Sequence, residues 1–153
     1  MRAIVLLGGE ISLVNDEKYD ELVIYSWHLH SNGYAVRCNG GHSTYMHRVV
    51  INAPDKVWVD HIDGDKLDNR IENLRLCNAS QNGGNRGPIC NNELGYKGVR
   101  KHRKNYQARV IFHGKETTIG TFTTPEEAAR AYDNKVMELF GEFAKTNFIK
   151  ETE

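Results

Sequence analysis

The sequence of 153 residues lacks several features that mark specialised protein classes. Its longest uncharged apolar runs, residues 3–7 and 110–112, are far shorter than the roughly 20 residues that span a bilayer. No secretory signal follows the first residues, so we expect a cytoplasmic protein without membrane contact. The three cysteines are odd in number and widely spaced, with no zinc-knuckle pattern, and we interpret them as free thiols: Cys38, Cys77 and Cys90.

Net charge is also absent, because 20 Lys and Arg residues balance 20 Asp and Glu residues. Taken alone, this balance argues against a nucleic-acid partner. The charges are unevenly distributed, however. Residues 95–115 hold seven basic side chains and no acidic one, whereas residues 1–94 and 116–153 each carry more acidic than basic side chains. The basic stretch is therefore either a solvated loop or a nucleic-acid-binding surface.

Hydrophobic residues make up 39% of the chain and charged residues 26%, as in ordinary globular proteins, and the length allows one ordinary domain or two small ones. Residues 83–93 are rich in Gly, Asn and Pro, which favours a linker. We expect a nuclease-containing region over 1–87, a linker over 88–94 and a second domain over 95–150.

The N-terminal region reads as strand-rich. Strands are predicted over 4–7 and 11–14, followed by a short helix that begins at an Asn15 cap. The Asn32-Gly33 pair predicts a hairpin turn between strands over 27–30 and 34–37. A second short helix is expected from Thr44 to just before Pro54.

The second domain is predicted to contain three short strands, over 96–101, 106–112 and 116–122. A helix follows, with Thr124 as its cap, Pro125 in its first turn and Glu127 completing a capping box. Its apolar face ends at Gly141. Three strands and one amphipathic helix form about the smallest two-layer core.

The densest polar cluster lies between residues 59 and 85. A calcium-binding EF-hand is excluded, because placing Gly64 at loop position 6 puts Val59 and His61 where oxygen ligands are needed. Phosphodiester hydrolysis instead requires a base that deprotonates water and a hard cation held by oxygen ligands. Asp60, His61 and Asn82 have the side-chain types for this chemistry.

Residues 45–86 closely resemble the HNH endonucleases of phages and mobile introns, in the Asp60-His61 pair, the segment over 68–75 and the Ser-Gln-Asn over 80–82. The resemblance implies a ββα-metal nuclease module, also called a His-Me finger, with its core over 45–87. It implies that Asp60 and Asn82 bind one Mg²⁺ or Mn²⁺ and that His61 is the general base, giving 5′-phosphate and 3′-hydroxyl ends. Asn73 would fix the loop behind His61.

Two features of this resemblance leave alternatives open. Many relatives carry a second histidine where this sequence has Asn82, so the metal preference is not predicted. His47 and Arg48 match the family's His-Arg before the finger, and would either contact DNA phosphates or support the fold.

Residues 95–148 resemble an AP2 domain, through Gly-Tyr-Lys-Gly-Val-Arg at 95–100, Ile-Gly-Thr-Phe at 119–122 and Ala-Lys-Thr-Asn-Phe at 144–148. Such domains lay a three-stranded sheet, packed on one helix, in the DNA major groove. Alternation along a strand predicts Arg100 with His102 on one face, and Gln107 with Arg109 as a second pair. The candidate DNA contacts are Lys97, Arg100, His102, Arg103, Gln107 and Arg109. Thr118 stands where plant relatives usually have Trp, so their base preference is not transferred.

The leading hypothesis is an α+β homing-type endonuclease of a phage-infected or bacterial cell, which binds double-stranded DNA through its AP2 sheet and nicks one strand. We expect a monomer or a weak dimer. The alternative is a non-catalytic, sequence-specific DNA-binding regulator. A scaffold that binds no DNA would leave the basic stretch unexplained. Residues 1–44 either buttress the finger or widen a minor groove; the target sequence is not predicted.

Overall fold

The computed structural model describes residues 1–85 and 93–148, in two compact units that divide between Asn78 and Ala79. The positions of the units relative to one another are not determined, so each is described by itself. The mixed α and β composition expected from the sequence is confirmed. Most of the expected linker, including Cys90, lies outside the described residues. Among the helices of the described part, none is long and apolar enough to cross a bilayer.

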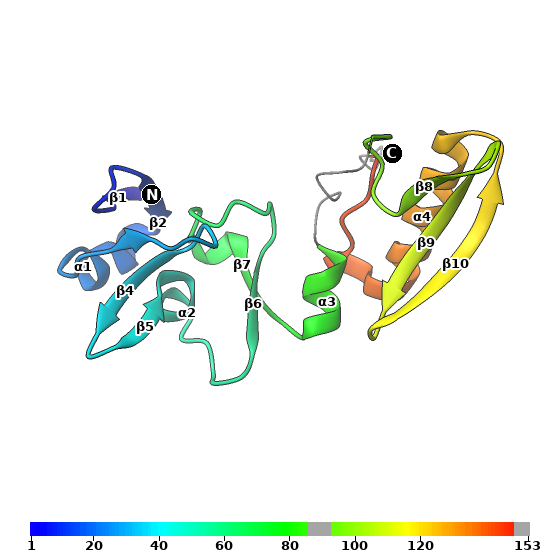
Figure 1. The fold of residues 1–153 in the computed structure, drawn as a ribbon. Coiled ribbons are helices and arrows are strands. Elements are labelled where there is room, and N and C mark those ends of the chain that lie inside the picture. Colours follow the sequence, from blue (N-terminus) through cyan, green and yellow to red (C-terminus); the bar gives the residue numbers. More distant parts are fainter. Residues whose placement is uncertain (86–92, 149–153) are drawn as a thin grey trace. The chain divides into compact units, whose positions relative to one another are not determined.

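The first unit contains three small antiparallel sheets and two short helices (Figure 1). In chain order its elements are β1 (Arg2–Val5), β2 (Ile11–Val14), α1 (Asp16–Val23), β3 (His28–Leu29), β4 (Ala35–Asn39), β5 (His42–Tyr45), α2 (Met46–Val50), β6 (Trp58–His61), the 3-10 helix η1 (Ile71–Asn73) and β7 (Leu74–Cys77). The strands pair as β1-β2, β3-β4-β5 and β6-β7. No sheet here is large enough to enclose a core alone, so the sheets share one.

That shared core draws side chains from the sheets and the helices of the unit. Trp27 is fully buried, and its indole Nε1 donates a hydrogen bond to the Leu22 carbonyl at 2.8 Å. The buried apolar members are Ile4, Leu6, Val14, Leu22, Trp27, Ala35, Met46, Val50, Val59 and Leu74. Because Val59 and Leu74 lie on β6 and β7, the same core anchors the hairpin that carries Asp60 and His61.

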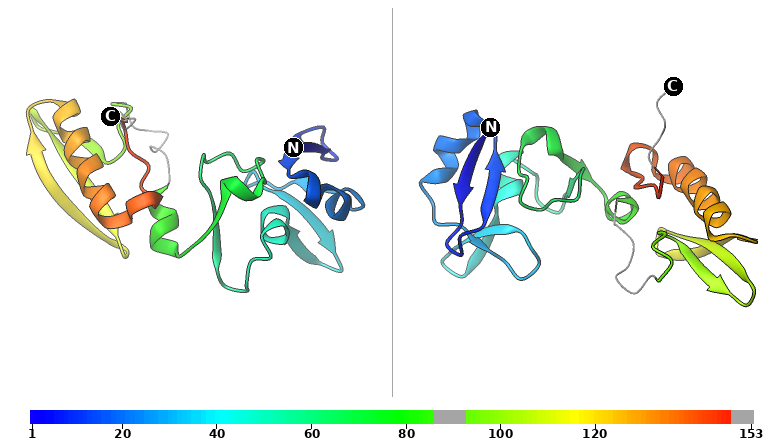
Figure 2. Two further views of the ribbon diagram at one scale, coloured as in Figure 1. Left: turned by 180° about the vertical axis from the view of Figure 1, so that it is seen from behind. Right: turned by 90° about the horizontal axis from the view of Figure 1, so that it is seen from above.

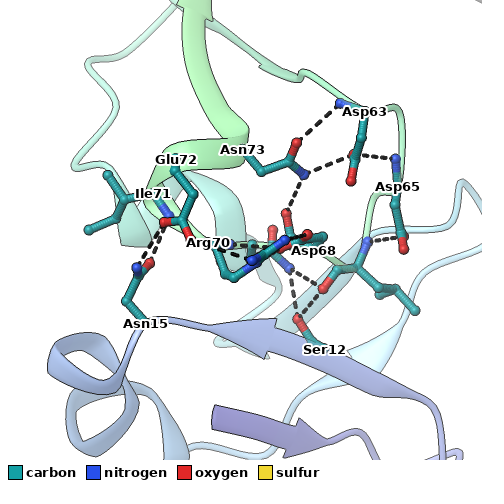
Figure 3. Close-up of polar contacts among 11 residues, drawn as sticks. Ser12, Asn15, Asp63, Asp65, Asp68, Arg70, Ile71, Glu72 and Asn73 are labelled. Carbon is teal, nitrogen blue, oxygen red and sulfur yellow. Dashed lines mark hydrogen bonds and ion pairs between the residues drawn. The ribbon is translucent and has the colours of Figure 1, made fainter. Parts of the chain in front are cut away.

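The expected cap of the first helix is only partly correct. Asn15 has the extended backbone of an N-cap, but its side chain makes no capping hydrogen bond to α1. Instead, its Nδ2 donates to Glu72 at 2.9 Å and its Oδ1 accepts from the Ile71 amide at 2.7 Å (Figure 3). A local capping signal was thus overridden by a contact with η1, more than fifty positions along the chain.

The second unit is a three-stranded antiparallel sheet covered on one face by a helix (Figures 1 and 2). Its elements are α3 (Ala79–Gly84), β8 (Val99–His102), β9 (Asn105–Phe112), β10 (Lys115–Phe122), α4 (Pro125–Phe140) and the 3-10 helix η2 (Gly141–Phe143). The predicted strands and helix are confirmed, as is the capping box between Thr124 and Glu127. The Ser-Gln-Asn segment over 80–82 lies on the short helix α3, which belongs to this unit.

Gly98 allows the start of β8 to approach α4 closely. Its φ is +74°, and a Cβ built on it would lie 2.1 Å from two ring carbons of Tyr132. Its carbonyl also accepts a hydrogen bond from the Arg109 amide at 2.8 Å. Tyr132 is buried in the core of this unit, so neither partner has room to move.

We expect Gly98→Ala to lower the free energy of unfolding by about 3 kcal/mol or more, from the positive φ and from overpacking against Tyr132. Gly95→Ala is the matched control, because Gly95 has φ +72° and open space for a Cβ among the described residues. It should cost only about 1 to 2 kcal/mol. Urea unfolding measures both variants, and equal losses would show that the contact with Tyr132 is unimportant.

Candidate active site

Asp60 and His61 end strand β6, and both are almost completely buried, with exposed fractions of 5% and 4%. Antiparallel pairing with β7 places Arg75 opposite Asp60. The Arg75 Nε and Nη2 donate to Asp60 Oδ2 at 2.9 and 2.8 Å. This ion pair fixes the orientation of the carboxylate, because rotating it would break two charge-assisted hydrogen bonds.

The His61 ring is held by a side chain that the sequence did not single out. Its Nε2 lies 3.1 Å from Asn69 Oδ1. Burial lowers the pKa of His61 below its usual value, and this effect outweighs the Asn69 hydrogen bond and the nearby Asp63, which raise it. An imidazole with a lowered pKa is neutral near pH 7, which is the state that accepts a proton.

Asn73 braces the loop that follows His61. Its Oδ1 accepts a hydrogen bond from the Asp63 amide at 3.1 Å, and its Nδ2 donates to Asp63 Oδ1 and to the Asp68 carbonyl, both at 2.9 Å (Figure 3). Its carbonyl also accepts from the Ile62 amide at 2.9 Å. One side chain therefore links both ends of the acidic loop, as expected of a residue that fixes the loop behind His61.

Strand β2 contacts the same loop, which the sequence gave no reason to expect. The Leu13 amide donates to the Leu67 carbonyl, and the Asn69 amide donates to the Leu13 carbonyl, both at 2.9 Å. Next to this contact, the Arg70 Nε and Nη2 donate to the two carboxylate oxygens of Asp68 at 2.8 and 2.5 Å. Strand β2 and the ion pair between Arg70 and Asp68 therefore both hold the acidic loop, residues 62–73, in place.

His47 lies in an aromatic cluster beside His61. The ring centroid of His47 is 5.3 Å from that of His61 and 4.8 Å from that of Tyr34, which is itself 5.6 Å from His61. Burial, with smaller contributions from the charges of His61 and Arg48, lowers the pKa of His47 to about 3. Of the two alternatives left open for His47, a buried, neutral ring packed against His61 favours support of the fold over a phosphate contact.

Arg48 is also engaged inside the first unit. Its Nη1 donates to the Val57 carbonyl at 2.7 Å, and its Nη2 donates to the Pro54 carbonyl at 2.6 Å. These bonds close the turn between α2 and β6. Of the two alternatives left open for Arg48, its contacts favour support of the fold over a phosphate contact.

The expected metal ligand Asn82 lies on α3, in the second unit, whereas Asp60 and His61 lie in the first. Within the described residues, no three or more His, Cys, Asp or Glu side chains gather into a metal site. The expected ligands, Asp60 and Asn82, are one carboxylate and one carboxamide. Their oxygen donors match the preference of Mg²⁺ and Mn²⁺ for hard ligands.

The sheet of the second unit presents a polar face away from α4. Val99, Ala108 and Val110 point into the core, so the alternate residues of β8 and β9 face outward. Arg100 stands opposite Gln107, and its Nη2 donates to Gln107 Oε1 at 2.7 Å. These contacts agree with the two expected same-face pairs, Arg100 with His102 and Gln107 with Arg109.

Two other expected contacts are placed differently. The Lys97 amide donates to Asn147 Oδ1 at 2.6 Å, and its ammonium lies 5.9 Å from the ring centroid of Tyr132 on α4. Burial, reinforced by nearby Lys145, lowers the pKa of Lys97 to about 8. Lys97 therefore faces the helix and not the outer face, on the same side as the core residue Val99 two positions later. Arg103 is exposed in the turn between β8 and β9.

Sequence reasoning missed Ser12, Tyr34, Asn69 and Arg75. Arg75 could have been found, because antiparallel pairing of the apolar segments on either side of the acidic loop places it opposite Asp60. Asn69 stood inside the segment that resembles HNH endonucleases, without an assigned role. Ser12 and Tyr34 carried no signal, since their contacts depend on how distant strands pack.

The shifted pKa of His47 predicts a pH-dependent stability. An unfolded imidazole titrates near 6.5, so neutral buried His47 contributes its full stability above that pH, and the contribution is lost as the pH falls toward 3. Between about pH 7 and about pH 5, the wild type should lose about 2 kcal/mol more unfolding free energy than His47→Phe, which has no imidazole at this position to charge. Parallel losses in the two proteins, measured by urea unfolding, would contradict this assignment.

Part of the chain is similar to plant transcription factors. An AP2-like ethylene-responsive transcription factor of Arabidopsis thaliana is 46% identical over 57 residues. The match covers 35% of this chain and 16% of the plant protein. This similarity is confined to a small part of a much longer protein.

The HNH similarity is broader. The family model described as HNH endonuclease matches residues 44–83, which include Asp60, His61, Asn73 and Asn82. An uncharacterised HNH endonuclease of Acanthamoeba polyphaga mimivirus is 37% identical over 94% of this chain and 80% of its own length. Protein 3.8 of Escherichia phage T7 is 32% identical over 60% of this chain and 77% of its own length. With a buried Asp-His pair at the end of β6 and relatives matched over most of their length, the chain belongs to the HNH endonuclease family.

Proposed function

We propose that this protein is a metal-dependent, homing-type DNA endonuclease that nicks one strand, with His61 as the general base. The observation that carries this proposal is the environment of His61. The ring is buried, its pKa is lowered, and Asn69 holds it by a hydrogen bond. His61 also directly follows Asp60 in the sequence. A surface histidine without a catalytic role does not require such an arrangement.

In the proposed reaction, a water oxygen attacks phosphorus while the His61 imidazole takes the water proton. The bond from phosphorus to the 3′-oxygen breaks and that oxygen takes a proton from solvent water, which leaves a 5′-phosphate and a 3′-hydroxyl; His61 then releases its proton to solvent. Burial keeps the imidazole neutral and so able to accept the proton, and Asn73 keeps the adjoining loop in place.

Asp60 and Asn82 are the residues that would hold one Mg²⁺ or Mn²⁺. Such a cation, when bound, would neutralise charge that develops on the phosphate and on the leaving oxygen. The Arg75 ion pair keeps the Asp60 carboxylate oriented before any cation arrives. In this proposal β6, β7 and α3 are the elements of a ββα-metal finger, with one cation site per chain, so a monomer nicks and two chains are needed to cut both strands.

The second unit would bind double-stranded DNA as an AP2-type sheet. The basic stretch over 95–115 spans β8 and β9, and the outward pairs Arg100 with His102 and Gln107 with Arg109 lie on its polar face. An arginine can bond both O6 and N7 of a guanine in the major groove. Arg103, in the exposed turn, is placed to hold a phosphate and so adds affinity without sequence information.

His61→Ala should slow nicking of phage DNA by at least about 100-fold, because the attacking water loses its base. His42→Ala is the matched control, since His42 is exposed on β5, and it should cleave like the wild type. Cleaved ends are mapped by sequencing. Undiminished nicking by His61→Ala would exclude His61 as the base.

Removing divalent cations with EDTA should abolish cleavage and spare DNA retention on gels, and added Mg²⁺ or Mn²⁺ should restore cleavage. Loss of both cleavage and retention would assign the metal a structural role. A wild type that retains DNA but never cleaves it with either cation would support the regulator hypothesis.

Arg100→Ala and Arg109→Ala should each weaken binding to a selected DNA site by about 1 to 3 kcal/mol, because each removes a bidentate base contact. Lys135→Ala is the matched control: Lys135 lies on α4 and pairs with Glu138. Its binding should match that of the wild type. The site is selected from random-sequence duplexes and measured by gel retention over a salt series. A logarithmic salt slope near zero would contradict phosphate contacts, each of which contributes about −0.9.

A further inference from the structure

We propose that Asn69 is a positioning residue for the general base, and that it holds His61 as the tautomer that carries hydrogen on Nε2. Nδ1 is then the nitrogen that accepts the proton from water. Asn69 is itself anchored by Ser12 of the N-terminal hairpin, which is formed by β1 and β2. This inference rests on the proposed function of His61. It also gives residues 1–44, whose role the sequence left open, a part in the active site.

The contacts of Asn69 are short and lie out of contact with solvent. Asn69 and Ser12 are both fully buried, each with an exposed fraction of 0%. The Asn69 Oδ1 is 3.1 Å from His61 Nε2, and its Nδ2 is 2.8 Å from Ser12 Oγ. The Asn69 amide therefore lies between the β1-β2 hairpin and the His61 imidazole, and one of its two ends contacts each of them.

The chemistry of the surrounding donors and acceptors decides which atom donates in each hydrogen bond from Ser12 through Asn69 to His61. The Leu67 carbonyl, 3.0 Å from Ser12 Oγ, can only accept, and Met46 Sδ, 3.3 Å away, has no hydrogen to donate. The Asn69 amide atom that faces Ser12 also lies 3.5 Å from the Leu67 carbonyl and 3.7 Å from Met46 Sδ, neither of which can donate. This atom is therefore the nitrogen Nδ2, which donates to Ser12 Oγ, and the Ser12 hydroxyl donates in turn to the Leu67 carbonyl or to Met46.

The other end of the Asn69 amide is consequently its carbonyl oxygen, and it faces His61. A carbonyl oxygen cannot donate, so the His61 nitrogen beside it carries the hydrogen. A neutral imidazole has one protonated and one basic nitrogen, and the basic one is then Nδ1. The opposite tautomer would place a hydrogen where a base must accept one.

The hairpin holds Asn69 by its backbone as well. The Asn69 amide donates to the Leu13 carbonyl at 2.9 Å, and the Leu13 amide donates to the Leu67 carbonyl at 2.9 Å. Ser12 and Leu13 are neighbours on β2, so a single strand fixes both the main chain and the side chain of Asn69. Figure 3 shows Ser12 reaching from this strand toward the acidic loop. The strand lies outside the matched range over 44–83.

The test uses three variants of the full chain. Asn69→Leu removes the acceptor at nearly constant volume, Asn69→Asp keeps an acceptor, and Ser12→Ala removes the anchor of the amide. Two quantities are measured: the ¹⁵N chemical shifts of the His61 ring, which report the tautomer, and kcat and KM for nicking of phage DNA with Mg²⁺. The shifts are recorded at a pH where His61 is neutral.

The wild type should show hydrogen on Nε2. Asn69→Leu should populate the opposite tautomer and lower kcat by about 10- to 100-fold with KM unchanged, the usual effect of losing a partner that orients a site residue. Asn69→Asp should retain the Nε2–H form and recover most of kcat. Ser12→Ala should give a tautomer ratio and a kcat between those of the wild type and Asn69→Leu, because the Asn69 amide can then rotate and exchange its two ends.

Asn15→Leu is the matched control. It removes another contact between the hairpin region and the loop, the bonds to Ile71 and Glu72, without touching His61. It should lower stability and leave the tautomer unchanged. If Asn69→Leu loses activity but keeps the wild-type tautomer, Asn69 is only structural and the inference is wrong. If Asn69→Leu does not fold, Ser12→Ala and Asn69→Asp decide by the same shifts.

The two proposals fail in different ways. A wild type that never nicks DNA overturns the proposed function, while the ring shifts still decide which nitrogen carries hydrogen. A wild type that nicks DNA with hydrogen on Nδ1 overturns the inference and leaves the proposed function standing.

Discussion

The first unit depends on the internal hydrogen bonding of a polar loop that is too short and too acidic to fold by itself. Residues 62–73 contain few apolar side chains, so carboxamides take the place of a hydrophobic core. Asn73 links the two ends of the loop, and Asn69 ties it to β2 and to His61. A buried amide is costly unless both of its ends are satisfied, so the loss of one of these contacts also weakens the others. The position of the His61 ring depends on this bonding, whereas Arg75 holds the Asp60 carboxylate.

Burial and charge are arranged differently in the two units. In the first, buried carboxylates are paired within the unit: Asp60 with Arg75, and Asp68 with Arg70. In the second, basic side chains lie on the outward face of the sheet. The helix α4, whose first turn is acidic, covers the opposite face of the sheet. The zero net charge is therefore the sum of two distributions with separate physical roles.

Much of the fold followed from local signals. The Asn32-Gly33 turn, the capping box at Thr124 and the strands of the second unit all occur where alternation and turn chemistry predicted them, because each depends on residues close in sequence. Local signals failed where a distant partner competed. Asn15 bonds η1 in place of its own helix.

The same division applies to the candidate site. The sequence by itself supplied the residues proposed for hydrolysis, Asp60 beside His61 with Asn73 and Asn82 at the spacing of the family it resembles, because covalent order sets that spacing. Only the tertiary structure decided that His47 is buried and neutral, and that Ser12 on β2 anchors the amide holding the His61 ring. Burial and long-range hydrogen bonding arise from the packing of strands far apart in the chain, and no local pattern encodes them.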